Sequence, residues 1–362
     1  MNPPLVTPVF LMKYPQVPGV TDYRPAIDDT GTRLVFERTV HQRTVGAQEA
    51  ANLHLELTID DTGTRLVFER TGHERTVDER IVGVQEAVHL YLLELTIPDA
   101  APRPFVPSLT HSTRPDWCWR GAGAPASPGR VAFSNGGIWL ADARGSGLEL
   151  LADTAGMAYP SWYPGGAALA VDNGSRSAHP NPCSTKIDTA GRVITPVLAN
   201  STIFAGMPSV NQVNPNLVAF AGQQIATDPS TPPHYDQERN YIWVTDASTE
   251  PPTVEPLDKD APVRGPFDPR YQGRAPWWSP DGNWVAFESS RAATQDPLRE
   301  YAIFIQDAAG KNPAVQVTDP KWNGQHPKWY PDGVTLVAAV SQQPGQRPFG
   351  IARLDVSAFV SG

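Results

Sequence analysis

The stretch Arg274-Ala-Pro-Trp-Trp-Ser-Pro-Asp-Gly-Asn-Trp-Val-Ala-Phe-Glu-Ser-Ser290 decides the fold of this chain. It reads as a proline-marked strand, a tight turn and a second, alternating strand. In the turn, Pro280 presets the backbone at one position and Gly282 accepts a positive φ, so the chain can reverse between the two strands. Related stretches recur at 326–340, 159–171, 24–36, 207–220 and 114–133. Repeated strand-turn-strand units predict an all-β protein.

A second kind of strand follows these copies, in which apolar residues lead up to an aspartate. Clear examples lie at 137–142, 241–246, 301–307 and 349–355, and a fourth short strand follows, as at 314–318. The unit is therefore a four-stranded antiparallel meander, which is the blade of a β-propeller. The abundance of proline (38 residues) and glycine (29), without a sustained helical period of apolar residues, agrees with short strands joined by turns.

The spacing of the anchor prolines gives the number of blades. These prolines are Pro25, Pro115, Pro160, Pro208, Pro276 and Pro327. The intervals between them are 45, 48, 68 and 51 residues after a first interval of 90, against a usual blade of about 40 to 50 residues. The sequence thus predicts six blades.

A tandem duplication explains the long first interval. Residues 27–39 recur without change as 59–71, and a weaker match continues, so 27–58 and 59–96 are two copies of the same strands. The second copy has no anchor proline, which favours an enlarged first blade; a seventh blade is the alternative. We expect a single propeller domain over 1–362, in which residues 5–10 supply the outer strand of the last blade and so remove an exposed sheet edge.

These repeats resemble those of the TolB-like β-propeller family, the WD40-like PD40 repeats, which read roughly Pro-x-Trp-Ser-Pro-Asp-Gly-x-x-Leu/Val-Ala-Phe. Residues 276–287 match this pattern almost position for position and 327–338 nearly so, whereas the other copies have lost the aspartate or the tryptophan. The resemblance implies a propeller over most of the chain. It implies little about activity, because the repeat supplies core and turn residues.

Composition argues against two classes of partner. With 29 Lys and Arg against 38 Asp and Glu, the net charge is −9, so no nucleic-acid-binding face is expected. The longest apolar run, at 334–340, is far shorter than the roughly 20 residues of a membrane span.

The first residues have no basic region ahead of an apolar core, so we expect a cytoplasmic protein as given, or a periplasmic or secreted one if a leader has been removed.

The residues just before the anchor prolines sample the mouth of the central channel and are the candidate ligand site. They include Arg24, Arg114, Tyr159, Arg274 and His326. Converging arginines suit a carboxylate, phosphate or sulfate group, because a guanidinium binds such groups bidentately. The alternative is that these arginines pair with channel carboxylates such as Asp22 or Asp116 and hold the blades together.

Insertions gather on one face of the predicted propeller, at 37–50, 172–182, 221–240, 289–300 and 341–348, whereas the turns on the opposite face are short. Loops elaborated on one face are typical of a binding surface.

Little in the sequence points to an enzyme. No Gly-x-Ser-x-Gly elbow occurs and nothing follows the last blade, so a peptidase catalytic domain is not expected. The eight histidines and the two cysteines, Cys118 and Cys183, form no metal-binding pattern, so we expect no cofactor, with a divalent metal in the channel as the alternative. We therefore expect a monomeric, non-catalytic propeller that binds a protein or an anionic ligand. The alternative is a lyase or hydrolase of acidic oligosaccharides, because oligogalacturonate-lyase-like propellers resemble this chain in repeat type.

Overall fold

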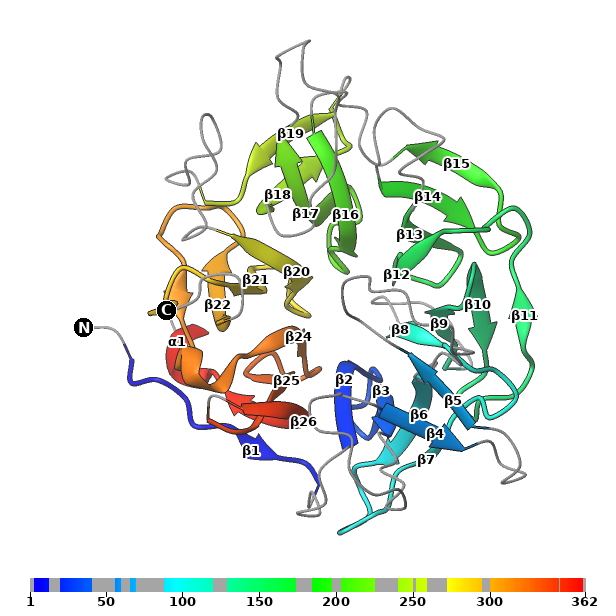
Figure 1. The fold of residues 1–362 in the computed structure, drawn as a ribbon. Helices are drawn as coiled ribbons and strands as arrows, with labels where there is room; N and C mark the ends of the chain where they lie inside the picture. The colour runs from blue at the N-terminus through cyan, green and yellow to red at the C-terminus, as the bar shows by residue number, and fades with distance from the viewer. Residues whose placement is uncertain are drawn as a thin grey trace, which may run out of the picture.

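Six antiparallel sheets, each of four strands, surround a central axis in the computed structural model (Figure 1). The structure describes residues 3–12, 20–40, 56–59, 66–69, 88–119, 129–173, 184–196, 203–224, 240–249, 252–258, 272–294, 300–344 and 346–360. Helix in these ranges is confined to η2 (Pro320–Trp322) and α1 (Ser357–Val360). The predicted all-β, six-bladed propeller is thus confirmed, and the described residues form no seventh four-stranded sheet.

The blades are numbered along the chain, with the strand nearest the axis given first. Blade 1 contains β2 (Val20–Ile27), β3 (Arg33–Val40), β6 (Val88–Glu94) and β7 (Arg103–Pro104). Blade 2 contains β8 (Thr113–Trp117), β9 (Val131–Ser134), β10 (Ile138–Ala141) and β11 (Glu149–Leu150). Blade 3 contains β12 (Ala158–Trp162), β13 (Ala168–Asp172), β14 (Ser184–Asp188) and β15 (Val193–Pro196).

The second half of the ring has the same strand order. Blade 4 contains β16 (Ile203–Val210), β17 (Leu217–Gln224), β18 (Tyr241–Asp246) and β19 (Thr253–Pro256). Blade 5 contains β20 (Gly273–Trp278), β21 (Trp284–Ser289), β22 (Ala302–Asp307) and β23 (Val315–Gln316). Blade 6 contains β24 (Gln325–Trp329), β25 (Thr335–Gln343), β26 (Gln346–Asp355) and the N-terminal β1 (Val9–Phe10).

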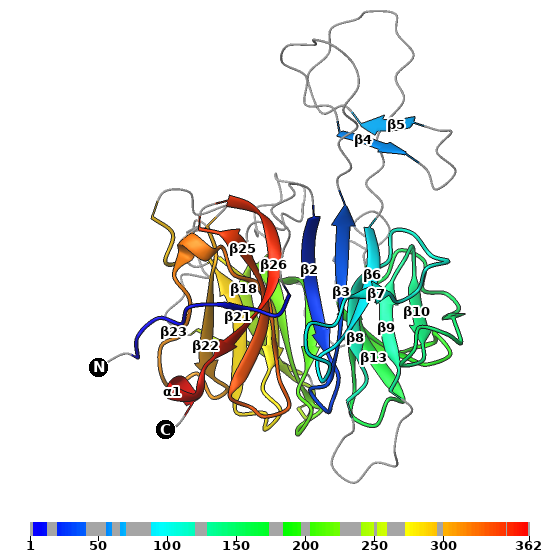
Figure 2. The same cartoon turned by 90° about the horizontal axis from the view of Figure 1, so that it is seen from below.

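The two ends of the chain meet in blade 6. Strand β1 pairs antiparallel with β26, in the register Val9↔Arg353, and lies on the outside of the ring (Figures 1 and 2). Upstream of β1, Val6 bridges to Thr318, next to the outer strand of blade 5. The N-terminal segment therefore contacts the last two blades and covers the outer edge of β26, which the sheet would otherwise expose.

The duplicated segment is divided between blade 1 and a separate hairpin. Blade 1 takes β3 from the first copy and β6 from the second. The remaining strands, β4 (Glu56–Ile59) and β5 (Leu66–Glu69), pair only with each other among the described residues. Their register, Ile59↔Leu66, repeats the Ile27↔Leu34 register of β2 and β3, because the same turn sequence joins both pairs.

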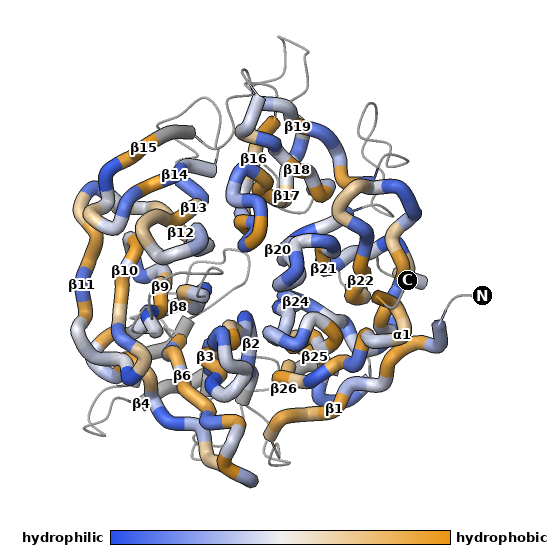
Figure 3. Tube along the Cα trace, turned by 180° about the vertical axis from the view of Figure 1, so that it is seen from behind, coloured by the Kyte–Doolittle hydropathy of each residue, from blue (hydrophilic) through white to orange (hydrophobic). Residues whose placement is uncertain are grey.

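The hydrophobic core lies between neighbouring blades, and hydrophobic positions recur along the strands of the ring (Figure 3). In one cluster, Val35 and Leu92 of blade 1 pack with Trp117 and Phe133 of blade 2. Four tryptophans near the ends of inner strands extend this contact by donating the indole N–H to a backbone oxygen of the preceding blade; they are Trp117, Trp162, Trp278 and Trp329. Adjacent blades are thus joined by apolar packing and a repeated hydrogen bond.

The Pro-Asp-Gly turn has the predicted geometry in blade 5. Gly282 has a φ of +72°, and a Cβ at this position would lie 2.7 Å from Oδ1 of Asn211. Glycine is therefore required both by the backbone conformation and by the close approach of blade 4.

Candidate functional site

A bulge interrupts every inner strand at the anchor proline. In each blade the pairing of the first two strands shifts register there. The residue before the proline has a positive φ in all six cases: Arg24 (44°), Arg114 (55°), Tyr159 (51°), Met207 (53°), Ala275 (49°) and His326 (50°). Because a β-bulge re-aims the side chain at its position, the same bulge in each blade turns these six side chains in a common direction.

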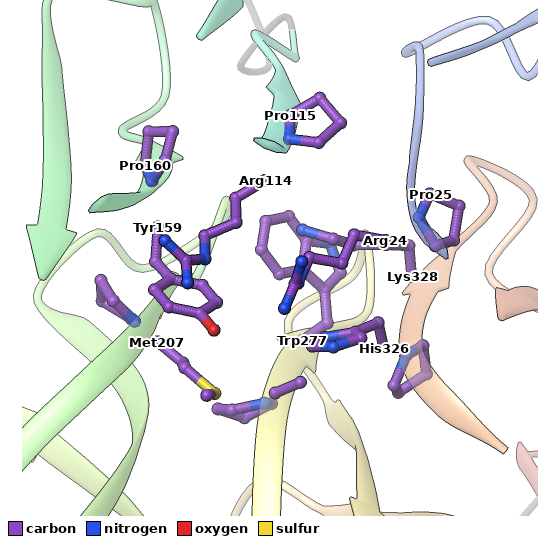
Figure 4. Close-up of a pocket in the computed structure, with 14 residues that line it drawn as sticks. Arg24, Pro25, Arg114, Pro115, Tyr159, Pro160, Met207, Trp277, His326 and Lys328 are labelled. Atoms are coloured by element: carbon purple, nitrogen blue, oxygen red, sulfur yellow. The ribbon is translucent and has the colours of Figure 1, made fainter. Parts of the chain in front are cut away.

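The six pre-proline residues meet at the axis and line a cavity of about 50 Å³, together with the six prolines, Trp277 and Lys328 (Figure 4). The predicted site residues Arg24, Arg114, Tyr159 and His326 are thus brought together. In blade 5 the lining residue is Ala275, and Arg274 lies one position earlier in the strand. The described part of the predicted site therefore contains two lining arginines rather than three.

Two buried glutamates fix the pre-proline residues and link neighbouring blades. Glu37 accepts a 2.7 Å hydrogen bond from Nη1 of Arg24 in its own blade and one of 2.6 Å from the backbone N–H of Arg114 in the next. Glu288 accepts a 2.7 Å hydrogen bond from Nε of Arg274 and one of 2.7 Å from the backbone N–H of His326. Arg24 and Arg274 therefore stabilise the ring.

The carboxylates that the sequence suggested as partners are engaged elsewhere. Asp22 pairs with Arg38 through two hydrogen bonds of 2.6 and 2.7 Å. Asp116 pairs with Lys328. The expected pairing of channel arginines with carboxylates occurs, but with Glu37 and Glu288, because these lie opposite Tyr23 and Arg274 in the register of the two inner strands.

Arg114 differs from the other two arginines in its carboxylate contacts alone. Its guanidinium lies over the Tyr159 ring, 4.0 Å from the centroid (Figure 4), just as Arg24 lies over Tyr23 and Arg274 over Tyr301. Its buried Nε has no hydrogen-bond partner, which also holds for Nε of Arg24. No carboxylate forms an ion pair with this guanidinium in the part of the chain that the structure describes. Its backbone is held by Glu37 while its side chain keeps donors available.

The field in the cavity is positive. Burial lowers the pKa of His326 well below its usual range, and Arg24, Arg274, Lys328 and Arg114 lower it further. His326 is therefore neutral at neutral pH, with its ring in edge-to-face contact with Tyr23.

A second ring of residues lies one position after the anchor prolines and was missed by the sequence reasoning. Its members are Ala26, Asp116, Ser161, Ser209, Trp277 and Lys328. These residues occupy the same position in each repeat, so the ring was predictable from the same prolines that identified the first. Ser161, Ser209 and Asp116 accept backbone N–H groups of the next blade, at 3.1, 3.3 and 3.1 Å.

Lys328 and Asp116 form an ion pair within the second ring. Lys328 Nζ lies 3.6 Å from Oδ1 of Asp116 and 2.8 Å from the centroid of a Trp277 ring. Burial raises the pKa of Asp116 to about 6 and lowers the pKa of Lys328 to about 8, and each shift is partly offset by the opposite charge of the partner.

Several other proposed features lie outside the described residues. These are Cys183, His179, His234 and most of the insertions at 37–50, 172–182 and 221–240. The insertion at 289–300 is described at 289–294 and 300, and the one expected at 341–348 is largely the hairpin of β25 and β26, with Gln343 opposite Gln346. Within the described ranges, no cluster of three or more His, Cys, Asp or Glu could hold a metal ion. No described helix is long and apolar enough to cross a membrane.

The sheet arrangement and the axial cavity define the protein as a six-bladed β-propeller. Its fold is TolB-like, as the sequence predicted. TolB from Acinetobacter baumannii superposes with a TM-score of 0.50 at 15% sequence identity. The match covers 75% of this chain and 60% of the length of that protein. A putative TolB from Agrobacterium tumefaciens gives 0.50 at 15% identity, covering 70% of this chain and 80% of that one.

The remaining comparisons assign neither an activity nor a family to this chain. An oligogalacturonate lyase from Vibrio parahaemolyticus matches over 97% of both chains, but its TM-score of 0.44 at 11% identity is too low to bear on activity. No family model and no curated protein sequence matches the chain.

Proposed function

We propose that this chain is a non-catalytic binding propeller whose axial cavity takes an anionic group, carried by a small molecule or by a protein. The observation that carries the proposal is the Arg114 guanidinium, which faces the cavity and has no carboxylate partner among the described residues, whereas Arg24 and Arg274 each have one. A partly buried cation without a partner is costly, and a bound anion would remove this cost.

The charges around the cavity favour a single anionic group. Three cations have a carboxylate each: Arg24 with Glu37, Arg274 with Glu288 and Lys328 with Asp116. Arg114 then leaves one positive charge in excess, and a guanidinium bound to a carboxylate or sulfate makes charge-assisted hydrogen bonds.

The cavity has room for a small anionic group. About 50 Å³ accommodates roughly three to five water molecules, taking about 10 to 15 Å³ for each. A carboxylate or sulfate group fits this space.

Thermal melting in the presence of anions tests the proposal. Acetate, citrate, sulfate and galacturonate are titrated at constant ionic strength into the wild type, Arg114→Gln and the matched control Arg144→Gln, whose side chain is exposed. We expect small anions to raise the melting temperature of the wild type and the control. Arg114→Gln should weaken binding by about 10- to 150-fold, the equivalent of roughly 1.5 to 3 kcal/mol.

Two further measurements accompany this titration. We expect neither Mn²⁺ nor EDTA to change the anion response, because the proposed site uses guanidinium donors alone. We expect a monomer in sedimentation. A wild type that shows no anion response, or a response that Arg114→Gln leaves intact, contradicts the proposed function.

A further inference from the structure

Lys328 places a buried amine in the wall of the same cavity. Its side chain is only 15% exposed, and it follows Pro327 on β24. The 3.6 Å from Nζ to the Asp116 carboxylate exceeds the 2.7 to 2.9 Å usual for a charge-assisted hydrogen bond. The amine is therefore attracted by Asp116 without being bound tightly by it, and it remains part of the cavity lining.

Burial disfavours the charged form of Lys328, and the contacts of Nζ with the Trp277 face and with Asp116 offset this effect only in part. The cavity also contains Arg24, Arg114 and the neutral His326, so Asp116 is the one anionic group facing the amine among the described residues. Burial lowers the pKa of Lys328 to about 8, which leaves more of the amine neutral at neutral pH than in an exposed lysine. Buried lysines with this property serve as nucleophiles toward carbonyl groups.

The cavity thus combines an anchor for a carboxylate with a nucleophile for a carbonyl carbon. We propose that it captures a small 2-oxo acid covalently, with the carboxylate on Arg114 and the carbonyl carbon bound to Nζ of Lys328 as a Schiff base. This inference rests on the proposed function, because it uses the same anion site. The smallest members of the class, such as glyoxylate, fit a cavity of about 50 Å³.

The reaction needs no further reactant. The Nζ lone pair attacks the carbonyl carbon, and the C=O π electrons move to the oxygen. Transfer of a proton from nitrogen to that oxygen gives a carbinolamine. The hydroxyl group then leaves as water with one added proton, while the second N–H proton is released, and a C=N bond forms. Asp116 is placed to accept and return these protons.

Reductive trapping on the intact wild-type protein tests this proposal. The protein is incubated with glyoxylate and cyanoborohydride, and peptide mapping compares carboxymethylation at Lys328 and at Lys321. Lys321 is a matched internal control, because it also pairs with an aspartate, Asp319 at 3.0 Å, but is 53% exposed. We expect labelling of Lys328 to be faster by about tenfold, since its larger neutral fraction is only partly offset by lower nucleophilicity.

Controls separate specific capture from general reactivity. Acetate should slow the labelling of Lys328 but not of Lys321, and acetaldehyde, which has no carboxylate, should show less preference for Lys328 than glyoxylate does. Arg114→Gln should remove the preference, while Arg144→Gln should retain it. Equal labelling of Lys328 and Lys321 by glyoxylate, or a preference that neither acetate nor Arg114→Gln changes, would overturn the proposal.

The outcome also distinguishes this inference from the proposed function. If acetate raises the melting temperature but Lys328 is not labelled preferentially, the anion site stands and covalent capture is wrong. If acetate has no effect on melting and does not slow labelling, the proposed function and the assignment of a 2-oxo acid both fail.

Discussion

Lys328 of blade 6 pairs with Asp116 of blade 2 across blade 1, with 3.6 Å between Nζ and Oδ1. Blade 1 lies between these blades in the ring (Figure 1), and its residue at the equivalent position is the small Ala26. The pair thus links two blades that are not neighbours in the ring. Its titration should therefore be visible in the stability of the whole propeller.

The pair should make stability depend on pH in a defined direction. The pKa of Asp116 is raised from 3.8 to about 6, so between about pH 4 and 6 the unfolded chain loses this proton first and stability falls as pH rises. The pKa of Lys328 is lowered from 10.5 to about 8, so between about pH 8 and 10.5 the folded chain loses its proton first and stability rises with pH. The contribution of the pair is thus least favourable between pH 6 and 8.

The variant Lys328→Met, and the double variant that combines it with Asp116→Asn, test this dependence of stability on pH. The single variant leaves a buried carboxylate without its cation and should lose roughly 3 to 5 kcal/mol at pH 7, with a smaller loss at pH 5 where the carboxyl group is protonated. The double variant should recover most of the loss. Urea unfolding from pH 4.5 to 9 measures these free energies, and a loss independent of pH would contradict the assigned titration.

Arg274 should prove structural, in contrast to Arg114. Its partner Glu288 has a fully buried side chain and also holds the backbone of His326. Arg274→Gln leaves this carboxylate without a cation and should lower the free energy of unfolding by roughly 3 to 5 kcal/mol, while anions still stabilise the variant.

The control for Arg274 is an exposed ion pair in the same protein. Arg130 and Glu149 are 3.5 Å apart, with side chains 28% and 58% exposed. Glu149→Gln should change stability by less than about 1 kcal/mol. If Arg274→Gln instead removes the anion response with little loss of stability, Arg274 belongs to the ligand site.

The fold could be predicted from the sequence because its determinants are local and repeated. The Pro-Asp-Gly turn at 280–282 fixes the reversal between two strands, and the apolar run Val285, Ala286 and Phe287 forms a strand that is buried on both faces. The sequence did not predict which copy of the duplicated strands enters blade 1. Identical sequences at 33–39 and 65–71 could each form the second strand of blade 1, and only tertiary contacts select one of them.

The site was predicted in part. The prolines identified Arg24, Arg114, Tyr159 and His326 as neighbours, although they are far apart in sequence. The sequence reasoning did not separate the paired arginines from Arg114. The residue opposite the second position before the proline is Glu37 in blade 1 and Glu288 in blade 5, but Ser134 in blade 2. Comparing these three residues would have revealed the difference.

The indole hydrogen bonds between blades should contribute measurably to stability. Trp278 is 2% exposed and donates from Nε1 to the Ser209 carbonyl at 3.0 Å. Trp278→Phe removes this donor and part of the buried ring, and should cost roughly 2 to 4 kcal/mol in urea unfolding. Trp284→Phe, at a partly buried position on β21, is the control and should cost less than half as much. Equal losses would show that the hydrogen bond between blades adds little.

One copy of the duplicated segment should be dispensable. Deleting residues 33–64 joins Thr32 to Arg65, and residues 65–71 then repeat the sequence of 33–39 without change. The deletion removes β4 and transfers the sequence of β5 to the position of β3, so Glu69 replaces Glu37 opposite Tyr23. Because the lost hairpin pairs only with itself among the described residues, and a shorter connection costs slightly less entropy, stability should change by no more than about 1 kcal/mol.

A second deletion provides the comparison for this experiment. Removing residues 131–141 takes away β9 and β10 of blade 2, for which the chain holds no second copy, and should abolish cooperative unfolding. Circular dichroism and urea titration of both deletions separate the cases. Anion stabilisation should persist in the 33–64 deletion, because Glu69 can hold the Arg114 backbone as Glu37 does in the full chain. Loss of the cooperative transition in that deletion would show that the hairpin is an integral part of blade 1.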